Sequence, residues 1–234
     1  MQNIYVSQKP GEAFELNAAS ASSFLKEGTI INTRIGSNSV WYQNIVFKSD
    51  GNIVCIRLLD SYLGNMIMPG TGFAIKQTNE YFEYLFEGVV TGIKADFPAY
   101  VTIYVNKADE IINTRVFPRY DTYLASNIRP YWDESPYFSI VTNISLGGVA
   151  FVSRHQFDYG EECDVSIYLP GSRMILCKGK VIRRNIKSDY TDYSMQFTEM
   201  NEDNSNYLSD YLESLGVKIE KLKSDFFENI KNRL

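Results

Sequence analysis

Up to about residue 198, apolar, β-branched and aromatic side chains form short runs that end at glycine, proline, asparagine or serine. Runs of this kind are typical of strands separated by turns. Many short strands joined by regular turns indicate a barrel or a sandwich, so the chain is predicted to be mostly β. The N-terminal strands are expected at residues 29–35, 39–47, 52–59, 72–76, 81–94 and 100–105, with turns at residues 36–38, 49–52 and 68–70.

The hydrophobic period changes after Glu199. Residues 204–215 place apolar side chains at helical spacing, and Gly216 is predicted to interrupt this helix before an amphipathic segment at residues 217–234. Both segments are expected to cover the mouth or side of a barrel. For the last segment, docking of a partner or of a second copy of the protein is an equal alternative.

A polar stretch at residues 106–110 follows the last N-terminal strand and predicts a domain boundary. We therefore expect a β-barrel domain at residues 1–106, and a linker with an arginine loop at residues 107–120. A second domain is expected at residues 112–215, and a C-terminal amphipathic helix at residues 216–234.

The composition narrows the classes of function. The formal charge is −5 and the pI is near 5.1, so the chain has no global basic field that would hold nucleic acid. No stretch approaches the roughly 18 to 20 apolar residues that span a bilayer. The first six residues also lack the pattern of a secretory signal, so the protein is expected to be cytoplasmic.

The cysteines and the single histidine do not suggest a metal or redox site. Cys55, Cys163 and Cys177 lie in strand-like contexts without the CxxC spacing, which favours buried free thiols. His155 is the only histidine, and a surface or interface position is expected for it. We predict no metal, no cofactor and no catalytic residues.

Arg115 and Arg119 flank a proline in the segment Arg-Val-Phe-Pro-Arg. Pro118 lacks an N–H and pushes Phe117 toward extended geometry, so the segment is predicted to be a loop or the start of a strand. In such a segment two guanidinium groups can converge on one ligand. Their planar shape suits phosphate oxygens and the O6 and N7 acceptors of guanine.

A second polar motif follows 24 positions after Arg119. Asn143 and Ser145 supply short polar groups, and Gly147 and Gly148 permit a tight turn and close approach of the backbone to a ligand. An apolar run then resumes as a strand.

Together, RxxxR and [D/N]-x-S-x-x-G resemble the paired signature of PilZ domains, which bind the bacterial second messenger cyclic di-GMP. The resemblance covers roughly residues 112–215, because the strands expected at residues 160–170, 178–184 and 193–197 are similar to those of the family in order and spacing. It implies a six-stranded barrel. The first 106 residues resemble the split-barrel-like N-terminal domain of flagellar-brake (YcgR-like) proteins in length, strand pattern and position.

The resemblance implies a cyclic di-GMP site. Arg115 and Arg119 would bind the phosphates and stack on a purine, Asn143 and Ser145 would contact guanine and phosphate, and Gly148 would leave room for the ligand, next to Gly147. Thr114 stands where a second arginine commonly precedes the motif in the family. The resemblance therefore does not decide whether one or two molecules of cyclic di-GMP bind. Arg183 and Arg184 are given a minor role at most.

Three functions remain open at this point. The first is a cyclic di-GMP receptor that couples the ligand to motility, biofilm or surface behaviour through a rearrangement of its domains and a protein partner such as the flagellar motor. The second is a degenerate PilZ adaptor that acts only through protein contacts. The third, a flavin-using enzyme, is disfavoured because we find no nucleophile and base pair, metal cluster or phosphate loop. Carboxylates such as Glu80, Glu83 and Glu87 are interpreted as strand or turn surface.

Overall fold

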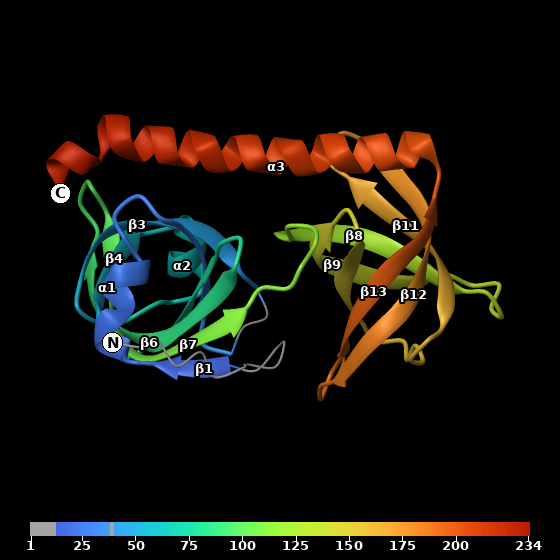
Figure 1. The fold of residues 1–234 in the computed structure, drawn as a ribbon, viewed down its shortest axis with the longest axis horizontal. Coiled ribbons are helices and arrows are strands. Elements are labelled where there is room, and N and C mark those ends of the chain that lie inside the picture. The colour runs from blue at the N-terminus through green and yellow to red at the C-terminus, as the bar shows by residue number, and fades with distance from the viewer. Residues whose placement is uncertain (1–12, 38–39) are drawn as a thin grey trace, which may run out of the picture. The chain divides into compact units, whose positions relative to one another are not determined.

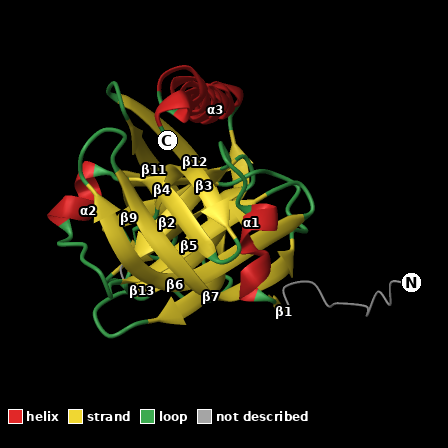
Figure 2. Ribbon diagram, turned by 90° about the vertical axis from the view of Figure 1, so that its left-hand side faces the viewer, coloured by secondary structure: helices red, strands yellow, loops and turns green. Residues whose placement is uncertain are grey.

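A computed structural model describes residues 13–37 and 40–234. The described chain forms two compact units. The first comprises the N-terminal residues to 115 together with residues 219–234, and the second comprises residues 116–218. Strands dominate both units, and α-helices are restricted among the described residues to α1, α2 and α3 (Figure 2).

The first unit contains a closed antiparallel barrel, seen in blue and green in Figure 1. Its strands follow the order β7-β4-β3-β2-β5-β6, and pairing of β6 with β7 closes the barrel, while β1 pairs with the last part of β7, beyond the residues that pair with β4. The strands are β1 (Ala13–Leu16), β2 (Ile30–Ile35), β3 (Tyr42–Asp50), β4 (Ile53–Arg57), β5 (Gly72–Thr78), β6 (Phe82–Lys94) and β7 (Tyr100–Ile112).

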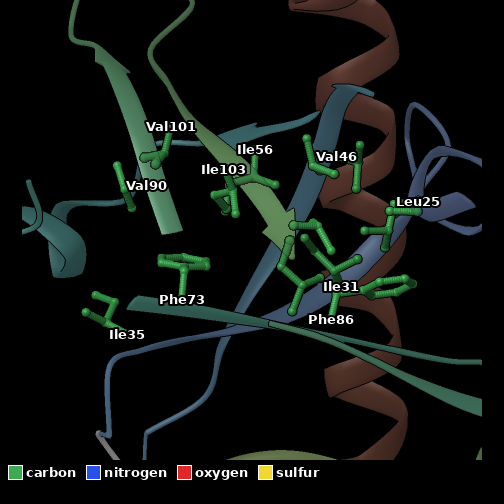
Figure 3. Packing of buried hydrophobic residues seen from close by; sticks show 14 of the residues in the cluster. Leu25, Ile31, Ile35, Val46, Ile56, Phe73, Phe86, Val90, Val101 and Ile103 are labelled. Carbon is green, nitrogen blue, oxygen red and sulfur yellow. The ribbon is translucent and has the colours of Figure 1, made fainter. Parts of the chain in front are cut away.

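Aliphatic and aromatic side chains from these strands point toward one another and fill the first barrel (Figure 3). Two short helices contribute to this core. Helix α1 (Ala21–Phe24), which follows the 3-10 turn η1 (Ala18–Ser20), contributes Ala21, and α2 (Asp60–Gly64) contributes Tyr62. The Tyr62 hydroxyl is buried among polar groups: it donates to the Thr33 hydroxyl and accepts from Asn44 Nδ2 at 2.6 Å.

The second unit is also a closed antiparallel barrel of six strands, in the order β10-β13-β12-β11-β8-β9. Alternation fixes which side chains face inward: on β11, Cys163, Val165, Ile167 and Leu169 are buried while the residues between them face outward. The strands are β8 (Tyr120–Pro130), β9 (Tyr137–Ser145), β10 (Gly148–Ser153), β11 (Glu162–Leu169), β12 (Arg173–Ile186) and β13 (Thr191–Met200).

Helix α3 (Glu202–Asn229) is one uninterrupted helix, followed by the 3-10 turn η2 (Lys231–Arg233) (Figure 1). Its first part packs on the second barrel through Leu208 and Leu212. Its last part packs on the first barrel, where Phe226 is fully buried and its ring stacks on Phe47 with centroids 5.5 Å apart. No helix in the described part of the chain is long and apolar enough to cross a membrane.

The fold class predicted from the sequence, two β-barrels with a C-terminal helix, is confirmed. The predicted break at Gly216 is wrong, because glycine in a helix interior costs only about 1 kcal/mol and both ends of α3 are held by packing. For residues 217–234, packing on a barrel and docking of a partner were equal alternatives. In the structure this segment packs on the first barrel.

Residues 107–112 were predicted to belong to a linker, but they continue strand β7. Their polar side chains are accommodated because this end of β7 pairs with both β1 and β6, and Asp109 accepts a hydrogen bond from Lys107 Nζ at 2.7 Å. The start of the predicted first domain, the last residue of the turn at 36–38 and the first residue of the predicted strand 39–47 lie outside the described residues.

Candidate ligand site on the second barrel

The arginine motif lies in the loop between β7 and β8, as predicted from its proline. The start of this loop is fastened to the turn that precedes β6. The Asn113 N–H donates to the carbonyl of Tyr81 at 2.7 Å, and Asn113 Nδ2 donates to the carbonyl of Asn79 at 2.9 Å. The Asn113 side chain also accepts from the N–H of Arg115 at 3.3 Å, so the backbone that carries the first arginine is positioned by the first unit.

Arg115 forms an ion pair within the first unit. Its Nη1 donates to Glu83 Oε2 at 2.7 Å, and the two side chains retain 34% and 20% of their exposure. Thr114, the residue before it, is exposed. Glu83 was interpreted from the sequence as strand or turn surface, and nothing in its neighbourhood on β6 signals a partner that lies 32 positions further along the chain.

The rest of the loop belongs to the second unit, where Phe117 contacts the second motif. A Cβ placed on Gly147 would lie 3.0 Å from the Phe117 ring, so the ring rests on this glycine. Phe117 remains 42% exposed, and Arg119, two residues further on, is exposed as well. The contact brings the loop that carries Arg119 to the tip of the β9–β10 hairpin.

The second motif forms this hairpin. Ser145 pairs with Gly148 across the two-residue turn Leu146 and Gly147, as the tight turn predicted from the glycines requires. The Ser145 hydroxyl donates to the carbonyl of Gly148 at 3.2 Å, and the N–H of Phe197 on β13 donates to the carbonyl of Gly147 at 3.1 Å. The tip of the hairpin is therefore held from within and by the adjacent strand.

Gly148 has a packing role that the family resemblance does not imply. A Cβ at this position would lie 2.2 Å from the carbonyl oxygen of Met195, so any side chain would force β10 away from β13. The glycine is required for closure of the barrel next to the hairpin tip.

Register places Asn143 in a row that crosses five strands on the outer face of the second barrel. Asn143 pairs with Asp121 on β8 and with Ala150 on β10, Ala150 pairs with Ser194 on β13, and Ser194 pairs with Arg183 on β12. Three inter-strand steps from Asn143 to Arg183 correspond to about 14 Å. Arg183 thus shares a face with Asn143, whereas Arg184 donates to Asp158 Oδ1 at 3.1 Å. Asp121 and Ser194 were not identified from the sequence because only the pairing brings them into this row.

The cysteines are buried free thiols, as predicted. Burial raises the pKa of Cys163 and of Cys177 to about 12, so both thiols stay protonated at neutral pH. His155, for which a surface or interface position was expected, is half-buried, and its ring stacks on Tyr137 with centroids 3.4 Å apart and meets Phe157 edge-on. Within residues 13–37 and 40–234, no group of three or more acidic, cysteine or histidine side chains is arranged to hold a metal ion.

The second unit is a closed barrel with an arginine loop resting on a polar β-hairpin. Residues 113–214 match the family described as PilZ domain, so this part of the chain is a PilZ domain, and the resemblance predicted from the two motifs is confirmed. None of the curated proteins matches the chain.

Several solved structures are similar to the chain at low identity. The Bacillus subtilis inhibitor of motility MotI/DgrA is 18% identical, with 82% of this chain and 98% of that chain covered and a TM-score of 0.42. The complex of MrkH from K. pneumonia with c-di-GMP is 14% identical, with 90% and 99% covered and a TM-score of 0.47. YcgR from Escherichia coli in complex with c-di-GMP is 11% identical, with 90% and 94% covered and a TM-score of 0.46.

Proposed function

We propose that the protein is a receptor for cyclic di-GMP that binds the ligand at the PilZ arginine loop and the β9–β10 hairpin. The observation that carries this proposal is the contact of Phe117 with Gly147, because it brings the loop with Arg119 to the hairpin with Asn143 and Ser145. Both halves of the PilZ signature are intact in the sequence, and both lie within residues 113–214, which match the PilZ domain.

The chemistry of the loop and the hairpin suits a dianionic purine ligand. Arg115 and Arg119 supply planar donors for phosphate oxygens and for stacking on guanine, and Asn143 supplies both a donor and an acceptor for a base edge. Asn143 and Arg183 lie on one row of the outer face of the barrel, with the small side chains of Ala150 and Ser194 between them. A two-base ligand can lie along this row with its far end near Arg183, which gives Arg183 the secondary role.

We infer the output of the receptor from the position of the arginine loop next to the boundary between the two units. Arg115 is the last residue of the first compact unit in this part of the chain, and Arg119 follows four positions later, so a ligand that binds this loop would act on the segment that joins the two units. Binding then changes the arrangement of the barrels and exposes or hides a surface for a protein partner in motility or surface behaviour. Small-angle scattering with and without cyclic di-GMP tests this step, and identical profiles would exclude it.

The test of binding is isothermal titration of the full chain with cyclic di-GMP. The wild type, the Arg115→Ala/Arg119→Ala double variant and an Arg129→Ala control are compared. Arg129 lies on β8 and forms an ion pair with Asp164. The control variant therefore lacks one surface arginine of the same domain at a position away from the hairpin. Loss of a charge-assisted contact of this kind costs roughly 2–5 kcal/mol, so the double variant should bind at least about thirtyfold more weakly while the control binds normally.

Binding of the wild type also gives the stoichiometry that Thr114 leaves open. Equal affinity of all three proteins would place the ligand elsewhere. Absence of binding in the wild type would instead favour the adaptor that acts without ligand.

A further inference from the structure

The ion pair between Arg115 and Glu83 uses an arginine that the proposed site needs. Glu83 lies on β6, next to the end of β7, and its carboxylate accepts a hydrogen bond from Arg115 Nη1 at 2.7 Å. A carboxylate is planar and a phosphate is tetrahedral, but both are anions whose oxygens accept hydrogen bonds from the N–H groups of a guanidinium. Glu83 therefore offers Arg115 an internal substitute for a phosphate oxygen.

The surrounding backbone favours this pair. Phe82 pairs with Ile112, so the end of β7 runs beside the start of β6. The hydrogen bonds of Asn113 to the carbonyls of Tyr81 and Asn79 continue this attachment one residue beyond the strand, and the side chain of Asn113 holds the N–H of Arg115. Arg115 is thus delivered to Glu83 by a fixed stretch of chain, which lowers the entropy lost in forming the pair.

We propose that Glu83 is a built-in competitor of the ligand for Arg115, and that it sets the affinity of the receptor. This inference rests on the proposed function. In the ligand-free protein the carboxylate neutralises the guanidinium, and an incoming phosphate group must displace it. Because both side chains are partly exposed to water, the pair is weak enough to open, and its competition should reduce affinity by about two- to fivefold.

The test is titration of the full chain with cyclic di-GMP for the wild type, Glu83→Gln and Glu87→Gln. Glutamine keeps the size of the side chain at position 83 and removes its charge. Glu87 is the matched control because it lies on the same strand and its replacement removes the same charge, while its cross-strand partner is Lys107. Glu83→Gln should bind about two- to fivefold more tightly than Glu87→Gln.

The outcomes separate this inference from the proposed function. If the wild type binds and the two variants have equal affinities, Glu83 does not compete and the inference is wrong, while the receptor function stands. If only Glu83→Gln binds measurably, the competition is stronger than expected and the inference holds. If none of the three proteins binds, both fail together.

Trypsin provides a second readout that needs no ligand. Cleavage after Arg115 requires its side chain to leave Glu83 and enter the protease, and the following Val116 is 85% exposed. Cleavage after Arg119, in the same loop, is the internal reference. Replacing Glu83 by glutamine should raise the ratio of cleavage after Arg115 to cleavage after Arg119 by about two- to fivefold, whereas Glu87→Gln should leave it unchanged. An unchanged ratio in Glu83→Gln would overturn the inference.

Discussion

Each barrel buries a tyrosine hydroxyl, but the partners differ. In the first barrel the Tyr62 hydroxyl meets the side chains of Thr33 and Asn44, so three polar residues from α2, β2 and β3 depend on one another. In the second barrel the Tyr193 hydroxyl accepts from the N–H of Phe157 at 3.0 Å and donates to the carbonyl of His155 at 3.1 Å. One polar side chain is sufficient there, because its partners are backbone groups.

Both hydroxyls fasten a segment that is not a strand. Tyr62 holds the short helix α2 over the core of the first barrel, and Tyr193 holds residues 155–157 over the core of the second. The same closed architecture therefore admits different internal polar groups. The comparison teaches that residues outside the shared architecture distinguish the two barrels. In the proposed function these residues are the arginine loop and the β9–β10 hairpin of the PilZ domain, together with Glu83 of the first barrel.

The largest expected effect concerns one glycine in each barrel. A Cβ on Gly88 would lie 2.2 Å from the carbonyl oxygen of Tyr104, and one on Gly148 would lie 2.2 Å from that of Met195. Gly88→Ala and Gly148→Ala should each lower the free energy of unfolding by about 3 kcal/mol, because backbone must move to admit the methyl group.

Urea unfolding followed by tryptophan fluorescence measures both variants, with Trp41 in the first unit and Trp132 in the second as reporters. Gly88→Ala should lower the urea midpoint reported by Trp41 more than the midpoint reported by Trp132. Gly148→Ala should have the opposite preference. Equal shifts of both reporters in both variants would show that the barrels unfold as one cooperative unit.

The two tyrosines are expected to differ in their response to removal of the hydroxyl. In Tyr193→Phe the buried N–H of Phe157 loses its partner, which should cost about 2 kcal/mol. In Tyr62→Phe the cost should be about 1 kcal/mol, because Thr33 still donates to the carbonyl of Tyr42 and Asn44 to that of Arg57. Thermal unfolding of both variants measures the difference, and a larger loss for Tyr62→Phe would contradict this account.

Much of the architecture was predictable because it depends on local pattern. The strand expected at residues 81–94 matches β6 at Phe82–Lys94, and Pro118 was enough to place the arginine motif in a loop. Helix α2 was missed because five residues between two strands carry too little periodicity to show a helix. The extension of β7 was missed because residues 106–110 are polar except for Ala108, and their strand conformation depends on pairing with β1 and β6.

Only the residues of the candidate site that belong to the two motifs were predictable from the sequence. The spacing of the two arginines, Asn143 and Ser145 was readable from the chain. The partner of Arg115 was not, because Glu83 reaches it through strand pairing over 32 positions and matches no motif. Ser194 and Arg183 likewise join Asn143 only through the register of β10, β13 and β12.

The two barrels should lose stability at different alkaline pH values. Burial raises the pKa of Cys163 and Cys177 in the second barrel to about 12, whereas an unfolded thiol ionises near pH 8.5. The folded state therefore keeps protons that the unfolded state releases, so stability is fully present below about pH 8.5 and falls as the pH rises. The expected loss is roughly 1.4 kcal/mol per thiol for each pH unit in this window.

The first barrel should respond later. Its Tyr84 has a pKa raised to about 12 by burial and then by Glu110, but an unfolded tyrosine ionises only near pH 10. Urea unfolding at pH 7.5 and pH 9.5 should thus show a loss reported mainly by Trp132. The Cys163→Ala/Cys177→Ala double variant is less stable at pH 7.5 and should show a smaller change between the two pH values. An equal pH dependence with and without the thiols would rule out this assignment.

The smallest expected effect is a gain in stability within α3. Gly216 lies inside the helix, and a Cβ there would meet no atom within 4 Å. Gly216→Ala should stabilise the protein by about 0.5–1 kcal/mol, because alanine loses less backbone freedom on folding. Gly171→Ala is the matched control: its Cβ also meets nothing, but its φ of +80° is unfavourable for alanine, so this variant should be destabilised. If Gly216→Ala is neutral or destabilising in thermal unfolding, the helix is not continuous through position 216 in solution. The helix break that the sequence predicts at Gly216 would then be correct.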